Sequence, residues 1–212
     1  MSAPGAAEPP RDCARCPRLL AFRAENRRKY PDFYNGAVTS FGDPAAELLV
    51  VGLAPGLKGA NRTGRPFTGD YAGDLLYPTL IRHGFAHGEF RADPEDGLEL
   101  RRAMVTNAVR CVPPQNKPTG AEIRTCRQYL IRRIESLARL KVIFLLGRIA
   151  HTSVLAALGL RQKDHPFAHA AVHRVDGLVL VDSYHCSRYN VNTGRLTPEM
   201  FDGAFRRAIA AL

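Results

Sequence analysis

The sequence has no long apolar run and too few acidic residues to balance its basic ones. Its longest apolar stretches, around residues 48–55 and 142–147, fall far short of the roughly 18 residues that a membrane-spanning helix needs. The amino-terminal segment MSAPGAAEPPRD has neither a basic start nor an apolar core, so it lacks the layout of a signal peptide. We therefore expect a cytosolic protein that does not act at a membrane.

The composition is that of an ordinary globular protein. Hydrophobic residues make up 45% and charged residues 24% of the chain, which excludes a disordered chain, a collagen and a coiled coil. A length of 212 residues is sufficient for one domain with a well-buried core. We expect residues 1–11, which are rich in Pro, Ala and Gly, to form a flexible tail before a single domain over residues 12–212.

The charge balance points to a polyanionic partner. Thirty Lys and Arg residues against 20 Asp and Glu residues leave a net charge of +10 at pH 7. Such an excess favours nucleic acid as the partner. A basic protein that is merely well solvated is the alternative at this stage.

Five cysteines, an odd number, do not suit a disulfide framework. Cys13 and Cys16 form a CxxC pair, and Cys111 and Cys126 lie far downstream. Together these four thiols could hold either zinc or an iron–sulfur cluster. Buried, inert cysteines are the alternative, which suits Cys126 on its apolar helix face better than the polar CxxC segment.

Alternation of strand and helix patterns predicts an α/β fold. Four apolar runs have the length of buried strands: residues 48–53, 103–107, 141–146 and 178–182. Helices are expected over residues 120–139, with a Thr119–Glu122 capping box, over 150–158, and after Thr197-Pro198. We predict a three-layer α/β/α architecture around a central, mainly parallel four-stranded sheet. Ligands of such folds bind at the carboxyl ends of the strands.

A glycine-rich segment follows the first predicted strand. Residues 52–74 hold six glycines, which permit tight turns and close approach of the backbone to a ligand. The segment lacks the Lys-Ser/Thr pair of a P-loop and contains no GxGxxG fingerprint. The common nucleotide-binding loops are thereby excluded.

Polar side chains also follow the second and fourth predicted strands. Asn107 ends the second strand, where its amide could read a base edge or, equally, cap a turn. His185 follows the fourth strand and could stabilise a developing anion. The adjacent Cys186 invites a catalytic-thiol interpretation, which we disfavour because neighbouring side chains point in different directions. Arg188, Tyr189 and Arg195 further along could contact phosphate or stack on bases, unless this is a solvated loop.

These segments together resemble the uracil-DNA glycosylase superfamily, specifically family 5 (type b) of its iron–sulfur branch. The resemblance rests on GLAPG at 52–56, GANRTGRPFTGD at 59–70, TNAVRCVPP at 106–114, the His185 loop and NTGRLT at 192–197. Leu53 stands where the sister family 4 has an acidic residue, as in GEAPG. Cys186 stands where many relatives have Pro after the motif histidine.

The resemblance implies a DNA-repair enzyme of base excision repair. Such an enzyme flips uracil, and in family 5 other deaminated bases too, out of DNA and hydrolyses the N-glycosidic bond, leaving an abasic site. A monofunctional hydrolase is expected, since no lysine occupies a motif position for a Schiff base. The four cysteines match the family's ligands for a [4Fe-4S] cluster. A monomer associated with the nucleoid is expected.

The resemblance also assigns residues. The catalytic set would be Asp70, Asn107 and His185. The base pocket would comprise Leu53, Ala54, Gly56 and Phe67, and the DNA-binding set Arg188, Tyr189, Asn190, Asn192 and Arg195. Asp70 could instead cap a helix, and Phe67 could be ordinary core.

Two functional alternatives remain open from the residues themselves: a non-catalytic lesion-recognition protein, and a nucleoside or nucleotide hydrolase on the same fold. Three histidines at four-residue steps, His165, His169 and His173, could in addition form a zinc site. We disfavour that site because Pro166 interrupts the helix it would need.

Overall fold

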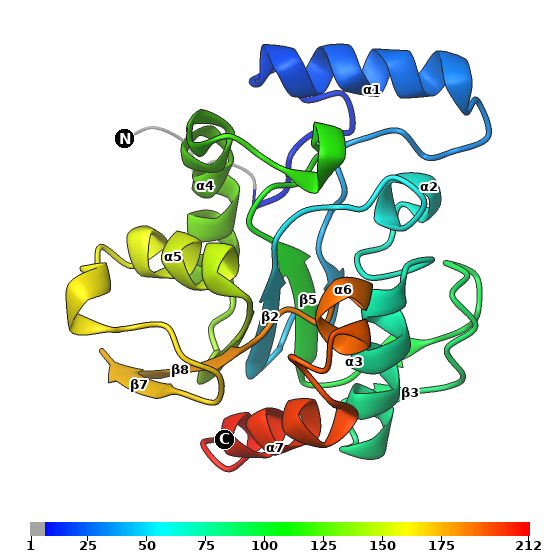
Figure 1. The fold of residues 1–212 in the computed structure, drawn as a ribbon. Helices are drawn as coiled ribbons and strands as arrows, with labels where there is room; N and C mark the ends of the chain where they lie inside the picture. The colour runs from blue at the N-terminus through cyan, green and yellow to red at the C-terminus, as the bar shows by residue number, and fades with distance from the viewer. Residues whose placement is uncertain (1–6) are drawn as a thin grey trace.

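The computed structural model describes residues 7–212, which form an α/β fold around a six-stranded sheet with strand order β1-β5-β2-β6-β8-β7 (Figure 1). Four strands are parallel and occupy the centre: β2 (Leu48–Gly52), β5 (Ala103–Asn107), β6 (Val142–Leu146) and β8 (Leu178–Ser183). The prediction of four strands is wrong in number, because β1 (Phe41–Gly42) and β7 (Val172–Val175) add an antiparallel strand at each edge. The predicted mainly parallel α/β class is confirmed.

Helices cover both faces of the sheet, which makes three layers. The helices are α1 (Pro17–Lys29), α2 (Ala60–Thr63), α3 (Tyr71–Arg82), α4 (Gly120–Ser136), α5 (Arg148–Ala157), α6 (Arg188–Asn192) and α7 (Pro198–Ile209). Short 3-10 turns, η1 (Pro114–Asn116) and η2 (Gln162–Asp164), and a small hairpin, β3 (Ala86–His87) with β4 (Glu99–Leu100), complete the chain. Helices α4 and α5 lie on one side of the sheet and α3 and α7 on the other (Figure 1).

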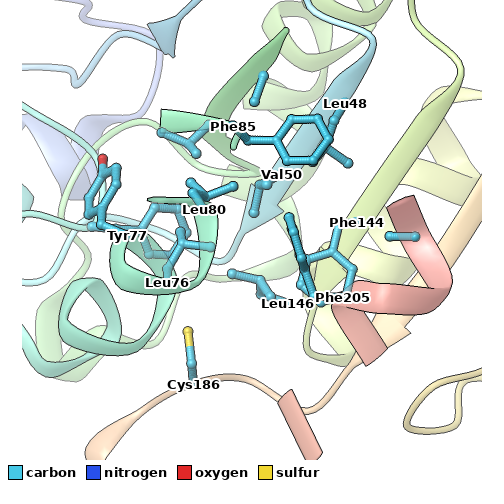
Figure 2. Close-up of a cluster of buried hydrophobic side chains, with 14 of the residues drawn as sticks. Leu48, Val50, Leu76, Tyr77, Leu80, Phe85, Phe144, Leu146, Cys186 and Phe205 are labelled. Atoms are coloured by element: carbon cyan, nitrogen blue, oxygen red, sulfur yellow. The ribbon is translucent and has the colours of Figure 1, made fainter. Parts of the chain in front are cut away.

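The core divides according to the alternation of side chains along each strand. Leu48 and Val50 of β2 point into a cluster with α3 and α7, whereas Leu49 and Val51 point into a cluster with α4 and α5. Figure 2 shows the first cluster, in which Phe144 and Phe205 meet with ring centroids 5.4 Å apart. Because both faces are covered, each central strand is apolar at almost every position, which is why these strands were recognisable in the sequence.

Local signals set the starts of α4 and α7 where they were predicted. The amide of Thr119 donates to Glu122 Oε2 at 2.7 Å and the amide of Glu122 donates to Thr119 Oγ1 at 3.3 Å, which is the predicted capping box of α4. Thr197 caps α7 through the amide of Met200. Helix α5 begins at Arg148, two residues before the predicted start.

The amino-terminal segment is packed as far as it is described. Residues 1–6 of the expected tail lie outside the described residues. In the remainder, the carboxylate of Glu8 accepts hydrogen bonds from Arg110, Arg133 and the amide of Ser40. Residues 7–11 are thus anchored to the domain, because the carboxylate of Glu8 pairs with two arginines there. Among helices in the described part of the chain, none has both the length and the apolarity to cross a membrane.

Candidate active site

A cleft of about 830 Å³ opens at the edge of the sheet where the parallel strands end. It is lined by the loop after β2, the start of α3, the β6–α5 turn and the loop after β8. Five predicted site residues lie on it: Leu53, Ala54, Gly56, Asp70 and His185, joined by Arg188 from the predicted DNA-binding set. The expectation that ligands bind at the carboxyl ends of the strands thus locates the cleft correctly.

Asp70 has two roles at once. Its Oδ1 accepts from the amide of Ala72 at 3.2 Å and so caps α3, which was the structural alternative for this residue. Its Oδ2 faces the glycine-rich loop, where the nearest backbone belongs to Gly56 and Gly59. Burial raises the pKa of Asp70 above its usual range, and the Ala72 hydrogen bond opposes that shift. The capping bond holds the carboxylate in a defined position at the cleft.

His185 faces Asp70 from the loop after β8 across the same cleft. Surrounding protein lowers the pKa of His185 to about 4 because it desolvates the charged form. The imidazole is therefore neutral at physiological pH and can donate one hydrogen bond. Gly147 makes room for it, since a Cβ at that position would lie 3.1 Å from the Cβ of His185.

Asn107 and Phe67 meet at the end of β2, behind the cleft rather than on its lining. Both are buried, with 4% and 6% of their surface exposed. A Cβ on Gly52 would lie 2.4 Å from the Phe67 ring and 2.6 Å from Asn107 Oδ1, so only glycine fits between them. The glycine-rich loop thereby brings the predicted stacking ring and the predicted base-reading amide together.

The backbone at Phe67 adopts the left-handed conformation, with φ of 53°. Its neighbours hold this turn: Arg65 forms a bidentate pair with Asp96 at 2.7 Å for both bonds, and Tyr77 donates to the Pro66 carbonyl at 2.6 Å. The pair is buried, and it ties the turn to the segment before β4. A buried network therefore fixes a strained residue at the site.

Residues of the predicted DNA-binding set lie on and around α6. Tyr189 is 72% exposed, and Asn192 and Arg195 are also exposed. Asn190 instead turns inward, where its amide donates to the His185 carbonyl at 2.8 Å. The exposed members form a surface beside the cleft, whereas Asn190 stabilises the His185 loop.

The further residues that line the cleft and that sequence reasoning missed include Lys58, Tyr71, Asn116 and Arg148. Arg148 follows β6 directly, so the rule about carboxyl ends of strands would have found it if applied to the third predicted strand as well. Asn116 comes from the Pro-Pro loop after β5, and no local pattern indicates that this loop reaches the cleft.

The four predicted ligand cysteines converge. Cys13, Cys16, Cys111 and Cys126 line one small cavity of about 20 Å³ between α1, α4 and the loop after β5. All five cysteines of the chain, which fall within residues 7–212, are free thiols. Burial raises the pKa of Cys111 to about 11 and that of Cys126 to about 12, so a bound cation is needed to hold them as thiolates at neutral pH.

The surroundings of the cysteines suit a thiolate-bound metal group. Arg23, only 1% exposed, directs Nη1 at Cys111 Sγ at 3.4 Å, and its Nε has no hydrogen-bond partner among residues 7–212. The amide of Arg110 donates to Cys126 Sγ at 3.3 Å. Donors aimed at the sulfurs are what stabilises ligand thiolates.

Cys186 is no part of this cluster or of the cleft. Its side chain is fully buried in the core (Figure 2). Burial raises the pKa of its thiol to about 12, which agrees with our disfavouring a catalytic thiol.

Comparison with known proteins gives consistent matches. The model of the uracil DNA glycosylase superfamily matches residues 39–208. The chain is 46% identical over 195 residues to the type-5 uracil-DNA glycosylase of Thermus thermophilus, covering 89% of each protein. It is 39% identical over 203 residues to that of Pyrobaculum aerophilum, covering 94% of this chain and 88% of the relative. A type-4 enzyme of Sulfurisphaera tokodaii is 31% identical over 180 residues, 80% of this chain and 73% of the relative.

Proposed function

Because the chain belongs to the uracil DNA glycosylase superfamily, we propose that it removes uracil from DNA by hydrolysing the N-glycosidic bond and leaving an abasic site. The observation that carries this proposal is the placement of the Asp70 carboxylate and the neutral His185 imidazole on one cleft. Breaking this bond builds positive charge on the sugar and negative charge on the leaving base. The two side chains are complementary to those two charges.

Each group has a distinct part in this reaction. The carboxylate of Asp70 stabilises the cationic sugar or orients the attacking water, as carboxylates do at oxocarbenium-like transition states. The imidazole of His185 donates a hydrogen bond to the base oxygen on which charge develops. One such preorganised donor typically contributes about 10²–10³ in rate. Because the pKa of His185 is about 4, the group acts as a neutral donor and not as an acid.

The rest of the pocket would bind the flipped base. Phe67 would stack on the ring and Asn107 would read its edge once the base reaches past the present lining to Gly52, and their shared proximity to Gly52 supports a joint role. The backbone of Leu53, Ala54 and Gly56 lies on the cleft wall where the base would enter. Extrusion of the nucleotide costs a few kcal/mol, which contacts of this kind offset.

The surface beside the cleft would hold the DNA. Arg188, Asn192 and Arg195 offer donors for phosphate, and the exposed ring of Tyr189 can enter the base stack. The excess of basic residues adds a non-specific attraction to DNA. Chromosomal DNA is accordingly the expected site of action. Exposed large apolar side chains within residues 7–212 are scattered singly over Leu20, Val172 and Tyr189, which supports a monomer.

We further propose that Cys13, Cys16, Cys111 and Cys126 hold a [4Fe-4S] cluster. Such a group would be bound by the four thiolates, and hydrolysis requires no electron transfer from it. The residues that ligate it join the segment before α1 to the loop after β5 and to α4. Its expected role is to fix α1 and the adjoining loop relative to the sheet.

A strand-cleavage assay tests the function. Cluster-loaded protein is incubated with end-labelled duplexes that carry a single uracil, hypoxanthine or normal base, and then with alkali. We expect cleavage at the lesion alone, lost in Asp70→Asn and His185→Ala and retained in the exposed controls Asp74→Asn and His87→Ala. Lesion binding without cleavage would support the lesion-recognition protein instead. Hydrolysis of free deoxyuridine with no salt-dependent binding to duplex would support a nucleoside hydrolase.

A further inference from the structure

A second polar cluster lies away from the cleft, behind the loop that carries His185. It consists of His151 on α5, His173 on β7 and Asp182 on β8, so three elements contribute one residue each. Of the histidines at four-residue steps in the sequence, His173 contributes a ligand atom, and the ring of His165 packs against that of His173 with centroids 5.4 Å apart. His169 turns elsewhere, and bonds the amide of Tyr184 and the carbonyl of Met200.

The cluster is buried and compact. Asp182 is fully buried and His151 is 1% exposed. Asp182 Oδ1 lies 2.8 Å from His151 Nδ1, and Asp182 Oδ2 lies 3.3 Å from His173 Nε2. Each of the three residues offers one atom that could ligate a metal ion, and these three atoms all lie within 4.8 Å of one another. Two ligands held about 2.0–2.2 Å from one metal ion lie at most about 4.4 Å apart, and roughly 3.3–3.6 Å apart in tetrahedral geometry, so a small adjustment of these side chains lets them share an ion.

The hydrogen bonding of His151 requires a positive charge in the cluster. Its Nε2 lies 2.9 Å from the carbonyl oxygen of His165, which can only accept, so Nε2 carries a proton. In a neutral ring Nδ1 then presents a lone pair, which faces a carboxylate oxygen at 2.8 Å. Two lone pairs at that distance repel, so the contact needs either a proton between the two atoms or a metal ion that both atoms ligate from one side.

A metal ion ligated by His151 would match a recurrent arrangement. A histidine that ligates a metal commonly donates its other N–H to a backbone carbonyl, which fixes the tautomer and the direction of the ring. The carbonyl of His165 does this for His151. The ring of Phe167 packs edge-on against His151, with centroids 5.5 Å apart, and supplies an apolar wall.

We propose that His151, His173 and Asp182 form a binding site for a divalent transition-metal ion such as zinc. Two imidazoles and one carboxylate suit zinc and other first-row divalent ions and suit magnesium or calcium poorly. The ion would join α5, β7 and β8 three residues before His185. The ion would thus stabilise the end of β8, from which the His185 loop departs. The proposal does not depend on the cysteine cluster or on uracil excision.

Zinc titration into tag-free, cluster-loaded protein tests the proposal. Calorimetry should give one bound zinc per chain, with iron content unchanged, and zinc at 100 times the dissociation constant should raise Tm by about 5 °C or more. His173→Ala, at a partly exposed edge strand, should abolish both effects. His87→Ala, which changes an exposed histidine outside the cluster, should retain them.

The wild-type protein provides a second test in case the variant does not fold. X-ray absorption at the zinc edge should show imidazole nitrogen and carboxylate oxygen about 2.0–2.2 Å from the metal. Sulfur neighbours would mean that zinc occupies the cysteine site and would overturn the proposal. So would a wild-type protein that binds no more zinc than His173→Ala, which would make His151 a buried imidazolium paired with Asp182.

Discussion

The loop glycine Gly59 lies directly against the carboxylate of Asp70. A Cβ at position 59 would stand 2.2 Å from Asp70 Oδ2 and 2.9 Å from Asp70 Cβ, closer than any real contact. The Asp70 carboxylate can therefore occupy its observed position only because residue 59 has no side chain. This contact links the glycine-rich loop to the proposed chemistry through sterics alone.

Gly59→Ala should reduce turnover about 10²-fold, because a displacement of a reacting group by about 1 Å can lower the reaction rate by that factor. Fold stability should fall by about 0.5–2 kcal/mol, since displacement of Asp70 breaks its capping bond to Ala72. Single-turnover kinetics on uracil-containing duplex measure the effect. Gly203→Ala on α7 is the matched control, since no atom lies within 4 Å of its Cβ position. Wild-type turnover in Gly59→Ala would contradict the proposed role of the Asp70 position.

The depressed pKa of His185 should make stability depend on pH. The folded protein holds this group at a pKa of about 4, whereas the unfolded chain has the usual value near 6.5. Between these values the unfolded state binds a proton that the folded state does not, so stability falls as pH falls through this window. Allowing for the open side of the cleft, the loss from pH 7 to pH 5 is about 1–2 kcal/mol.

Urea unfolding of wild type and His185→Asn at both pH values measures this contribution as a difference. The variant should lose less stability on acidification than wild type. His87→Asn, at an exposed position, should follow wild type. Equal pH dependence in all three proteins would show that His185 titrates normally.

Asp96→Asn should destabilise the protein strongly. It removes the charge that pairs with Arg65, and both side chains are buried, with 5% and 0% exposed. An unpaired buried guanidinium typically costs about 3–5 kcal/mol. Chemical denaturation measures the change, against Glu135→Gln in the exposed Arg132–Glu135 pair, which should cost less than about 1 kcal/mol. A small effect in Asp96→Asn would mean that the turn at Phe67 is held by other contacts.

Arg23→Gln should lower the reduction potential of the proposed cluster by an amount on the order of tens of millivolts. The reduced cluster is the more negative state, so the loss of a buried positive charge 3.4 Å from Cys111 Sγ disfavours it. A potentiometric titration followed by electron paramagnetic resonance measures the shift. Arg28→Gln, an exposed position on the same helix, should leave the potential unchanged. An unchanged potential in Arg23→Gln would separate this arginine from the cluster.

Arg188→Ala should weaken duplex binding at every sequence and reduce the slope of log K against log salt by about 1. Arg188 lies on the cleft rim, where a phosphate would approach. Fluorescence anisotropy at several salt concentrations gives the slope. Arg132→Ala, an exposed change on α4, should alter neither affinity nor slope. A slope unchanged by Arg188→Ala would place the DNA on another surface.

The hydrophobic pattern of the sequence was sufficient to predict the central strands of the sheet, but not the strands at its edges. Helices cover both faces of the four central strands, β2, β5, β6 and β8. Almost every position of such a strand is therefore apolar, and the resulting continuous apolar run is visible in the sequence. Strand β1 has two residues, and β7 alternates between exposed and half-buried positions. Neither pattern differs from that of a loop, because an edge strand owes its pairing to its neighbour's backbone and not to its own side chains.

Local motifs and the family resemblance were sufficient to propose the candidate site residues, but not to predict how they lie relative to one another. FTGD and the loop after the fourth predicted strand led to Asp70 and His185, and the structure places both on one cleft. Local motifs did not predict that Asp70 would line the cleft and cap α3 at once, or that Asn190 turns inward to His185. Both contacts depend on the direction of the side chain. Side-chain direction is decided by packing, for which local sequence carries no pattern.

By itself the sequence determined the α/β class, the four cysteines that come together and six of the residues that line the cleft, because strand burial, ligand chemistry and local motifs each leave a signature in the sequence. Tertiary structure alone decided which histidines meet a carboxylate. His151 and Asp182 lie 31 positions apart, and they face each other only because α5 packs beside β8. Such a contact depends on the packing of whole elements, and no spacing along the chain encodes it.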